Sequence, residues 1–266
     1  AQVYRGEGDE AVMNRYGFSV YPIITRATGA KIVMVDEADY RADVDALLAA
    51  VTERTKIVWL ANPNNPTGTY LNAAEVARLH AGLRPDILLV ADSAYAEYVT
   101  AADYSVGMDL VNAHENVVMV RTFSKMGLAA VRIGWMVGPE HVVDAIHRIR
   151  GPFNVNLPAQ QAGAAAARDV EFTQRLKEHN AIWRDYLTTE LAGNRMRVIP
   201  SQANFVLVLF ETPEIAARAF ETLVEAGYIV REIGASYGIH NGLRISIGSE
   251  EAMRAVVDVL KSMGDR

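Results

Sequence analysis

A lysine, an aspartate and an asparagine each follow a short apolar run, and together they could perform carbonyl chemistry. Asn65 lies in ANPNNPTG, Asp92 begins DSAYAEY, and Lys125 lies in RTFSKMGLAAVRIGW. A primary amine such as that of Lys125 forms a Schiff base with an aldehyde. A carboxylate can keep a heterocyclic nitrogen protonated, so that the ring withdraws electrons from a bound substrate. These three side chains therefore indicate a site for an aldehyde cofactor.

Hydroxyl groups and an arginine close to the lysine would complete such a site. Thr122, Ser124 and Arg132 lie within the same motif as the lysine. They can hold a phosphate, because hydroxyl and guanidinium groups donate hydrogen bonds to its oxygens. Tyr95, in DSAYAEY, supplies a phenol that could bond a ring oxygen together with Asn65. The set describes a binding site for pyridoxal 5'-phosphate.

The elements that must position these residues alternate between strands and helices through residue 150. Six runs rich in Val and Ile are typical of strands buried on both faces; they span 11–13, 31–35, 56–61, 87–91, 117–120 and 133–137. Between them, Asn72 and Glu75 form a capping-box pattern, and Pro139 stands at a helix start. The alternation predicts an α/β fold with a mostly parallel sheet and helices on both faces. Ligands bind beyond the carboxyl ends of such strands, where the three motifs lie.

The pattern changes after Gly151. An Ala-rich helical stretch is expected over 158–191, and strands are expected at 204–210, 228–231 and 243–247. Thr212 and Ser249 stand where helices should begin. We therefore expect two domains. A large cofactor-binding domain would cover 1–150, and a smaller α+β C-terminal domain, including the linking helix, would cover 151–266.

Composition and charge exclude several classes of function. The chain has 26 Lys and Arg, 32 Asp and Glu, a net charge of −6 and no basic run, which argues against a nucleic-acid partner. It has no cysteine, and its six histidines show no ligand spacing, so no disulfide framework and no metal is predicted. No apolar stretch is long enough to span a bilayer, and AQVYRGEGDE lacks the features of a signal peptide. These features fit a cytoplasmic protein without a membrane partner.

Four motifs in order resemble those of the fold-type I, class I and II aminotransferases, and most closely the histidinol-phosphate aminotransferases. They are ANPNNPTG, DSAYAEY, RTFSKMGLAAVRIGW and NGLRISIG, and the resemblance runs from about Gly8 to the C-terminus. It implies that Lys125 carries pyridoxal 5'-phosphate, that Asp92 pairs with its ring nitrogen, and that Phe18, in YGFSVYP, stacks on the ring. It also implies histidinol-phosphate:2-oxoglutarate transamination in histidine biosynthesis, by a homodimer with shared active sites.

The resemblance further implies a substrate subsite. Arg244, in NGLRISIG, matches the arginine that grips the anionic group of the substrate. Arg231, in YIVREIG, matches a second arginine typical of the histidinol-phosphate branch, and Asn204, in SQANF, lies in a motif near the substrate. Two guanidinium groups suit a phosphate dianion better than a single carboxylate. The catalytic residues implied are Lys125, Asp92 and Tyr95.

The chain departs from the family pattern at its N-terminal side. The family has an N-terminal arm and a Gly-rich phosphate-binding turn, and neither is found in this sequence. We therefore expect the large domain to lack its N-terminal part. Three other functions stay open: an aromatic or aspartate-type aminotransferase, a decarboxylase of phosphorylated amino acids, and a non-catalytic binding protein of the same fold.

A second motif points to a different chemistry. GASYG, residues 234–238, fits the G-x-S-x-G pattern of a hydrolase nucleophile elbow. In such hydrolases Asp and then His follow the serine, but here Asp258 comes after His240, the only later histidine. We therefore read GASYG as a loop.

Overall fold

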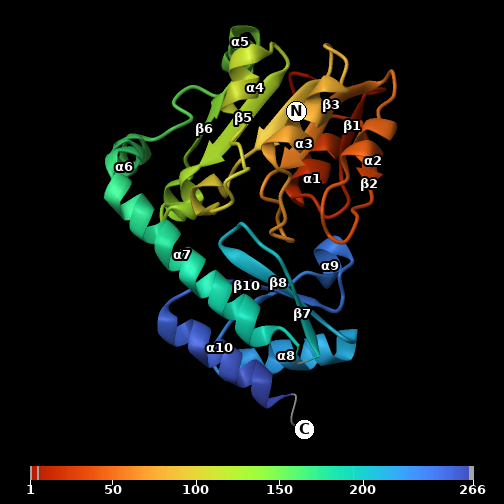
Figure 1. Ribbon diagram of the computed structural model, residues 1–266. Coiled ribbons are helices and arrows are strands. Elements are labelled where there is room, and N and C mark those ends of the chain that lie inside the picture. The colour runs from red at the N-terminus through yellow and green to blue at the C-terminus, as the bar shows by residue number, and fades with distance from the viewer. Residues whose placement is uncertain (1, 5, 194, 264–266) are drawn as a thin grey trace.

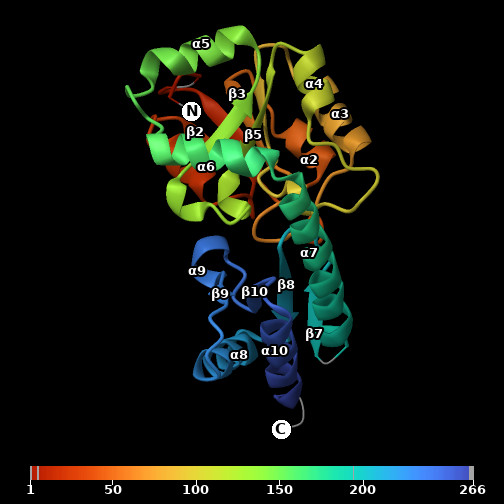
Figure 2. The ribbon, with the colours of Figure 1, turned by 90° about the vertical axis from the view of Figure 1, so that its left-hand side faces the viewer.

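The computed structural model describes residues 2–4, 6–193 and 195–263, which form two stacked parts, each built on one β-sheet (Figure 1). The long helix α7 (Val170–Leu191) runs from the first part down along the second, as Figures 1 and 2 both show. Its Leu176 packs beside Tyr98 of the first part, and its Leu187 lies in the core of the second. The helix therefore joins the two parts as well as connecting them in sequence.

The first sheet has six strands in the order β2-β1-β3-β4-β5-β6, and only the β5–β6 pair is antiparallel. Each of the six predicted runs falls on one of them, so the prediction of a mostly parallel sheet is confirmed. The strands are β1 (Glu10–Asn14), β2 (Lys31–Val35), β3 (Thr55–Ala61), β4 (Leu88–Asp92), β5 (Val117–Thr122) and β6 (Gly134–Val137).

Helices cover both faces of this sheet. One face packs against α2 (Val44–Ala49), α3 (Ala73–Ala81) and α4 (Met108–Ala113). The other packs against α1 (Val20–Arg26) and α5 (Glu140–Ile149). The capping box predicted from Asn72 and Glu75 begins α3 with both reciprocal hydrogen bonds, and Pro139 is the N-cap of α5. Both predicted helix starts are therefore confirmed.

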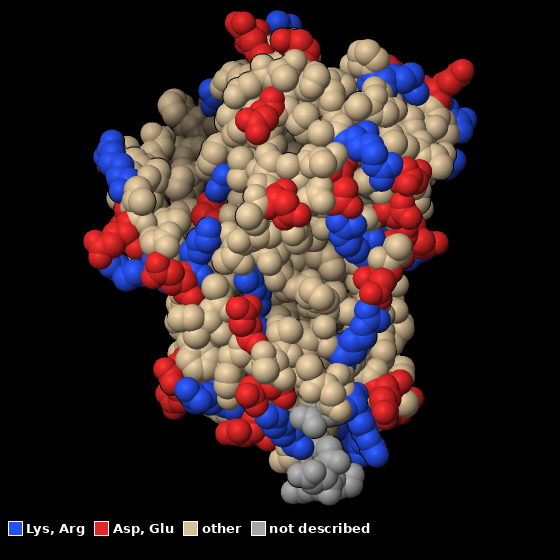
Figure 3. All heavy atoms as spheres, viewed as in Figure 1, with Lys and Arg blue, Asp and Glu red and all other residues tan. Residues whose placement is uncertain are grey.

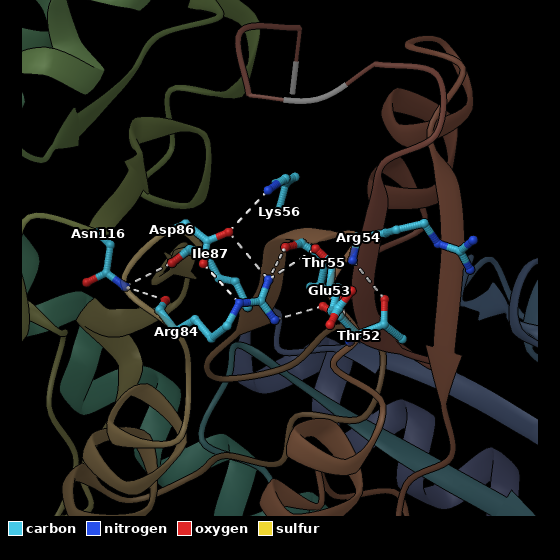
Figure 4. A network of polar contacts seen from close by, with 9 residues as sticks. All are labelled: Thr52, Glu53, Arg54, Thr55, Lys56, Arg84, Asp86, Ile87 and Asn116. Atoms are coloured by element: carbon cyan, nitrogen blue, oxygen red, sulfur yellow. Dashed lines mark hydrogen bonds and ion pairs between the residues drawn. The ribbon is translucent and has the colours of Figure 1, made fainter.

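A polar network ties the strand starts together at the edge of the sheet opposite the carboxyl ends (Figure 4). Arg84 donates to the main-chain oxygen of Thr52, which precedes β3, at 2.8 Å, and to the carboxylate of Asp86 at 3.0 Å. Asn116, which precedes β5, donates to the main-chain oxygen of Ile87 at 2.9 Å. The network gives hydrogen-bond partners to carbonyl groups in the turns that lead from helices into strands, so it holds the starts of β3, β4 and β5 side by side.

The second sheet has four antiparallel strands in the order β7-β8-β10-β9. Val208 and Ile245 point to a face covered by α7, α8 (Pro213–Glu225) and α10 (Glu250–Ser262). Leu207 points the other way, where Tyr16 and Tyr40 of the first part pack against it. The odd residues of β8 and the even residues of β10 therefore face the first part. The strands are β7 (Met196–Ile199), β8 (Phe205–Phe210), β9 (Arg231–Glu232) and β10 (Gly242–Ser246).

Four details of the C-terminal region differ from the sequence prediction. The helical stretch 158–191 is two helices, α6 (Leu157–Arg168) and α7, because the Asp169 side chain accepts from Phe172 N and caps the second. The strand expected over 228–231 is Arg231–Glu232, because Tyr228 N bonds Leu223 O at the end of α8. GASYG is not a loop but a short helix, α9 (Gly234–Tyr237), ended by Gly238 at φ 75°. The strand Met196–Ile199 was not predicted.

On the face shown in Figure 3, acidic and basic side chains are interspersed over both parts. Among the described residues, none of the helices combines the length and hydrophobicity needed to cross a membrane.

Candidate active site

Three neighbouring strands deliver their carboxyl ends to one cavity. Ala61 of β3 lies beside Asp92 of β4, which lies beside Val120 of β5. The loops that follow these strands and the turn that precedes α1 enclose a cavity of ≈ 260 Å³. All eight residues predicted to bind the cofactor line it: Phe18, Asn65, Asp92, Tyr95, Thr122, Ser124, Lys125 and Arg132. The structure thus brings them together, while their roles stay predictions.

Asp92 is the last residue of β4, and its carboxylate is held at both oxygens. Oδ1 accepts from Ala94 N at 3.1 Å, and Oδ2 accepts from the Tyr21 hydroxyl at 2.7 Å. Burial raises the pKa of this carboxyl, while the two hydrogen bonds and the nearby Lys125 ammonium oppose that rise. A buried carboxylate held in one orientation is suited to pairing with a cation that enters the cavity.

Lys125 ends a single 3₁₀ turn, Phe123–Lys125, that follows β5 directly. Thr122 caps the turn, since its Oγ1 accepts from Ser124 N at 3.0 Å. The Lys125 Nζ lies 5.3 Å from the centroid of the Tyr95 ring. Burial lowers the pKa of the amine, and the positive charges of Arg244 and Arg231 lower it further. The amine is therefore more often unprotonated, and so more nucleophilic, than an exposed lysine.

Ser124 and Arg132 form a pair of donors at the same end of the cavity. Arg132 Nη1 donates to Ser124 Oγ at 3.3 Å and to the main-chain oxygen of Ala129 at 2.9 Å. Its backbone is left-handed, with φ 55°. For a residue other than glycine this costs about 1 kcal/mol or more, and such strain is concentrated at binding sites. The pair presents hydroxyl and guanidinium hydrogens to an anion.

Asn65 and Tyr95 also line the cavity. Asn65 Oδ1 accepts from Arg244 Nη1 at 2.8 Å. The ring of Tyr95 packs edge-on against Phe205, with centroids 5.2 Å apart. Burial raises the pKa of Tyr95 to about 12, so that the phenol keeps its proton and can donate a hydrogen bond at neutral pH.

Two arginines of the second sheet face the first part. Because Leu243 and Ile245 point to the helices, Arg244 between them points the other way, and its Cζ lies 4.7 Å above the ring of Phe205. Arg231 is its direct partner on β9, so both guanidinium groups lie on one face. Burial lowers the pKa of Arg244, and Arg231 contributes to the shift. The buried Nε of Arg244 has no hydrogen-bond partner within the described residues.

The three residues predicted to bind the substrate, Arg244, Arg231 and Asn204, do not line the cavity as the eight predicted cofactor-binding residues do. Arg231 is exposed beside Arg244. Asn204 is partly buried, and its side chain lies beside the hydroxyl of Tyr98, where it opposes the rise in the pKa of Tyr98 that burial causes. The proximity of Asn204 to the substrate therefore stays a prediction, while its position beside Tyr98 was not predicted.

Two further residues at the cavity were missed by the sequence reasoning. Tyr21 holds Asp92, although it lies 71 residues away in the chain. Arg121 lines the cavity and forms a partly buried ion pair with Glu97. Both stand inside motifs already singled out, YGFSVYP and RTFSK. Their positions within those motifs were the only available signal. No group of three or more metal-ligating side chains that could hold a metal ion occurs in the part of the chain that the structure describes.

Comparison with known proteins decides the family. The model of the family "Aminotransferase class I and II" matches residues 2–260. This chain belongs to that family. This aminotransferase is 52% identical over 264 residues to the histidinol-phosphate aminotransferase of Nitrobacter hamburgensis. The aligned residues make up 98% of this chain and 72% of the relative. The resemblance read from the four motifs is thereby confirmed.

Solved structures support the same assignment. Histidinol-phosphate aminotransferase from Sinorhizobium meliloti, in complex with pyridoxal 5'-phosphate, superposes with a TM-score of 0.89 at 27% identity. The match covers 98% of this aminotransferase and 72% of that chain. An aspartate aminotransferase variant from Thermus thermophilus gives a TM-score of 0.83 at 26% identity, over 98% of this chain and 75% of that one. The fold is therefore that of the fold-type I aminotransferases.

Proposed function

We propose that this aminotransferase exchanges an amino group between histidinol phosphate and 2-oxoglutarate, using pyridoxal 5'-phosphate bound at Lys125. The observation that carries the proposal is the meeting of Lys125 and Asp92 in one cavity, delivered by β5 and β4. An amine and a buried carboxylate at the carboxyl edge of a parallel sheet fit an aldehyde cofactor with a basic ring nitrogen.

The donor set of the cavity fits each part of the cofactor. Asp92 would hold the ring nitrogen in its protonated form, and Asn65 with Tyr95 would bond the ring oxygen. Thr122, Ser124 and Arg132 would hold the phosphate, and Phe18 would lie against the ring; all of these residues line the cavity. When bound, pyridoxal 5'-phosphate supplies an electron sink for the bond that breaks at the substrate carbon.

The chain's own part in the reaction centres on the Lys125 amine. Its lowered pKa favours the neutral form, which attacks a carbonyl carbon and accepts a proton. When the Lys125 amine is not bonded to a carbonyl carbon, it can move a proton between two carbon atoms within its reach. Asp92 stays ionised beside a cation, because pairing lowers the pKa that burial raises. The Tyr95 phenol stays protonated and acts as a hydrogen-bond donor.

Arg231 and Arg244 support the choice of a phosphorylated substrate. They lie opposite one another on β9 and β10, so a dianion between them would relieve the repulsion of two like charges. The unpartnered Nε of Arg244 offers one donor for this purpose. The sequence identity of 52% and 50% to two histidinol-phosphate aminotransferases supports the same substrate.

The proposal predicts that Lys125→Ala abolishes covalent cofactor binding. Borohydride reduction of the wild-type protein loaded with pyridoxal 5'-phosphate should leave a mass label on the peptide that contains Lys125. The variant should carry no label and lose at least about a thousandfold in turnover, because one amine acts as both nucleophile and base. A label of equal yield on the variant would refute the role of Lys125.

Substrate choice is tested separately, with a panel of amino donors. The wild-type protein should have its highest kcat/KM with histidinol phosphate, and no carbon dioxide should be released. A preference for aspartate or an aromatic amino acid would assign the alternative aminotransferase activities. Carbon dioxide release from a phosphorylated amino acid would assign a decarboxylase.

The assembly and the location are part of the same proposal. The resemblance supports a cytoplasmic homodimer in which each active site is completed by the partner. Light scattering of the purified protein should give twice the mass of one chain, and a monomer with full activity would contradict the shared site.

A further inference from the structure

Tyr98 contacts the lysine turn but does not line the cavity. It ends the short 3₁₀ helix Ala96–Tyr98 that follows the Asp92 loop, and it is 3% exposed. It packs in a cluster with Tyr95 and Phe205. Its hydroxyl donates to the main-chain oxygen of Lys125. A carbonyl oxygen can only accept, so the phenol must keep its proton to make this bond.

The hydroxyl stays protonated at every pH at which the enzyme is expected to work. Burial raises the pKa of Tyr98 to about 12, and the neighbouring Glu97 carboxylate adds to the rise. The hydrogen bond is also shielded from water, and leaving a buried carbonyl without a partner costs about 1–3 kcal/mol. The contact is therefore a fixed restraint on the lysine turn.

The turn needs an external restraint because it is short. It contains one 3₁₀ turn, closed by Met126 N on Phe123 O, and is followed by Gly127 at φ 85°. A single turn next to a glycine has few internal bonds to hold its shape. The Tyr98 hydroxyl adds a bond from outside the turn, on the residue that carries the reactive amine.

Tyr98 is itself held by elements of the C-terminal half. Arg184 of α7, which is 4% exposed, donates to the main-chain oxygen of Tyr98 at 3.4 Å and to Thr100 Oγ1 at 2.9 Å. The Asn204 side chain lies beside the Tyr98 hydroxyl, and the main chain of Asn204 accepts from Ile247 N beyond β10. Tyr98 thus contacts the lysine turn through its hydroxyl and helix α7 through its main-chain oxygen.

We propose that Tyr98 is a positioning residue, whose hydroxyl fixes the main chain of Lys125 so that the amine stays in the cavity facing Tyr95 and Asp92. Asn204 and Arg184 link this restraint to the C-terminal part, which carries Arg244. The inference rests on the proposed function, because it assumes that Lys125 is the reactive residue. It assigns no contact between Tyr98 and the substrate or cofactor.

Tyr98→Phe tests the inference, because it removes the hydroxyl and keeps the packed ring. In the loaded enzyme we expect kcat to fall about tenfold with KM within twofold of wild type, since the amine is misplaced while the substrate subsite is intact. The midpoint of the pH titration of the cofactor's visible absorption should rise. A freer lysine turn lets the nitrogen escape the burial and the positive charges that hold its pKa down.

Tyr104→Phe is the matched control. The Tyr104 hydroxyl also donates to a main-chain oxygen, that of Asn62 at 2.8 Å, and burial likewise raises the pKa of Tyr104 to about 12. Loss of the Tyr104 hydroxyl should destabilise the fold by a similar amount without moving the pH midpoint.

Equal midpoints and equal kcat in Tyr98→Phe and wild type would overturn the inference, even if borohydride still labels Lys125 and the proposed function stands. Should Tyr98→Phe fail to fold, Asn204→Ala must raise the midpoint instead, and an unchanged midpoint there would equally overturn it.

Discussion

Asp92 shows how a buried charge is prepared at the scale of one residue. A lone carboxylate at this depth would be costly, and burial does raise its pKa. The Tyr21 hydroxyl and the Ala94 amide compensate for part of that cost, and they also fix which way each oxygen points. Tyr21 is placed in turn by stacking on Trp59, with centroids 4.9 Å apart. The orientation of the Asp92 carboxylate is thus set by the Tyr21 hydroxyl and the Ala94 amide.

Tyr21→Phe should weaken the site without unfolding it, because the stacked ring remains. Removing one hydrogen bond to a charged group costs about 1.5–3 kcal/mol, so kcat/KM is expected to fall by roughly ten- to a hundredfold. The pKa of Asp92 should rise further, since the Tyr21 bond lowers it. The acid limb of the pH profile of cofactor affinity should therefore move to higher pH. An unmoved limb would show that Tyr21 does not act through Asp92.

At the scale of elements, a carboxylate joins the turn after β1 to the loop after β2. Glu37 accepts from Tyr16 N at 3.0 and 3.2 Å, and burial raises its pKa to about 7. Tyr16 stacks on Tyr40 at 5.6 Å, and both rings pack beneath the second sheet. The ionisation of Glu37 therefore bears on the surface that receives the C-terminal part.

Glu37 should make the protein less stable as pH rises. Its folded pKa of about 7 lies above the unfolded value of 4.5, so the protonated folded form is favoured. This contribution is complete below pH 4.5 and is lost between there and pH 7. Glu37→Gln should be more stable than wild type at pH 8, by up to about 3 kcal/mol at about 1.4 kcal/mol per pKa unit. Urea unfolding at pH 5 and pH 8 measures this.

The exposed Glu225→Gln is the control for that experiment. It should leave the pH dependence of the free energy of unfolding unchanged. If Glu37→Gln retains the wild-type dependence, another group is responsible for it.

At the scale of the whole molecule, the two parts meet where backbone approaches backbone. Gly68, in ANPNNPTG, has φ 78°, and its main-chain oxygen accepts from Gln202 N at 2.8 Å. A Cβ there would lie 2.2 Å from Ser201 Oγ. That hydroxyl donates to Phe205 O and accepts from Ala203 N, so it cannot turn away without losing both bonds. The glycine therefore permits the contact between the cofactor loop and the second part.

Gly68→Ala should be destabilised more than a matched glycine substitution. Gly227→Ala is the comparison, because Gly227 has φ 88° and open space around it. The control should lose about 1–2 kcal/mol from the left-handed backbone alone, and Gly68→Ala a further 1–3 kcal/mol, roughly, from the collision. Thermal unfolding with and without pyridoxal 5'-phosphate measures both. Equal losses would mean that the close approach of Ser201 adds no cost to a side chain at position 68.

Local sequence patterns determined much of the first part. Strands buried on both faces appear as unbroken apolar runs, and the capping box of Asn72 and Glu75 is complete within four residues. The rule that ligands bind at the carboxyl ends of parallel strands then placed Asn65, Asp92 and Lys125 at one edge, where the cavity lies. The strand β7 and the helix α9 escaped prediction, because segments of four residues are too short to show a clear periodicity.

The amino-acid sequence by itself thus determined which chemical groups are present and on which strand ends they stand. Only the tertiary structure decided which of them touch: that Tyr21 holds Asp92, that Arg231 lies opposite Arg244, and that Asn204 faces Tyr98. The physical reason is separation along the chain. Hydrophobic periodicity and caps are set by neighbours within a few residues, whereas these contacts join segments 13 to 106 residues apart, and only packing brings such segments together.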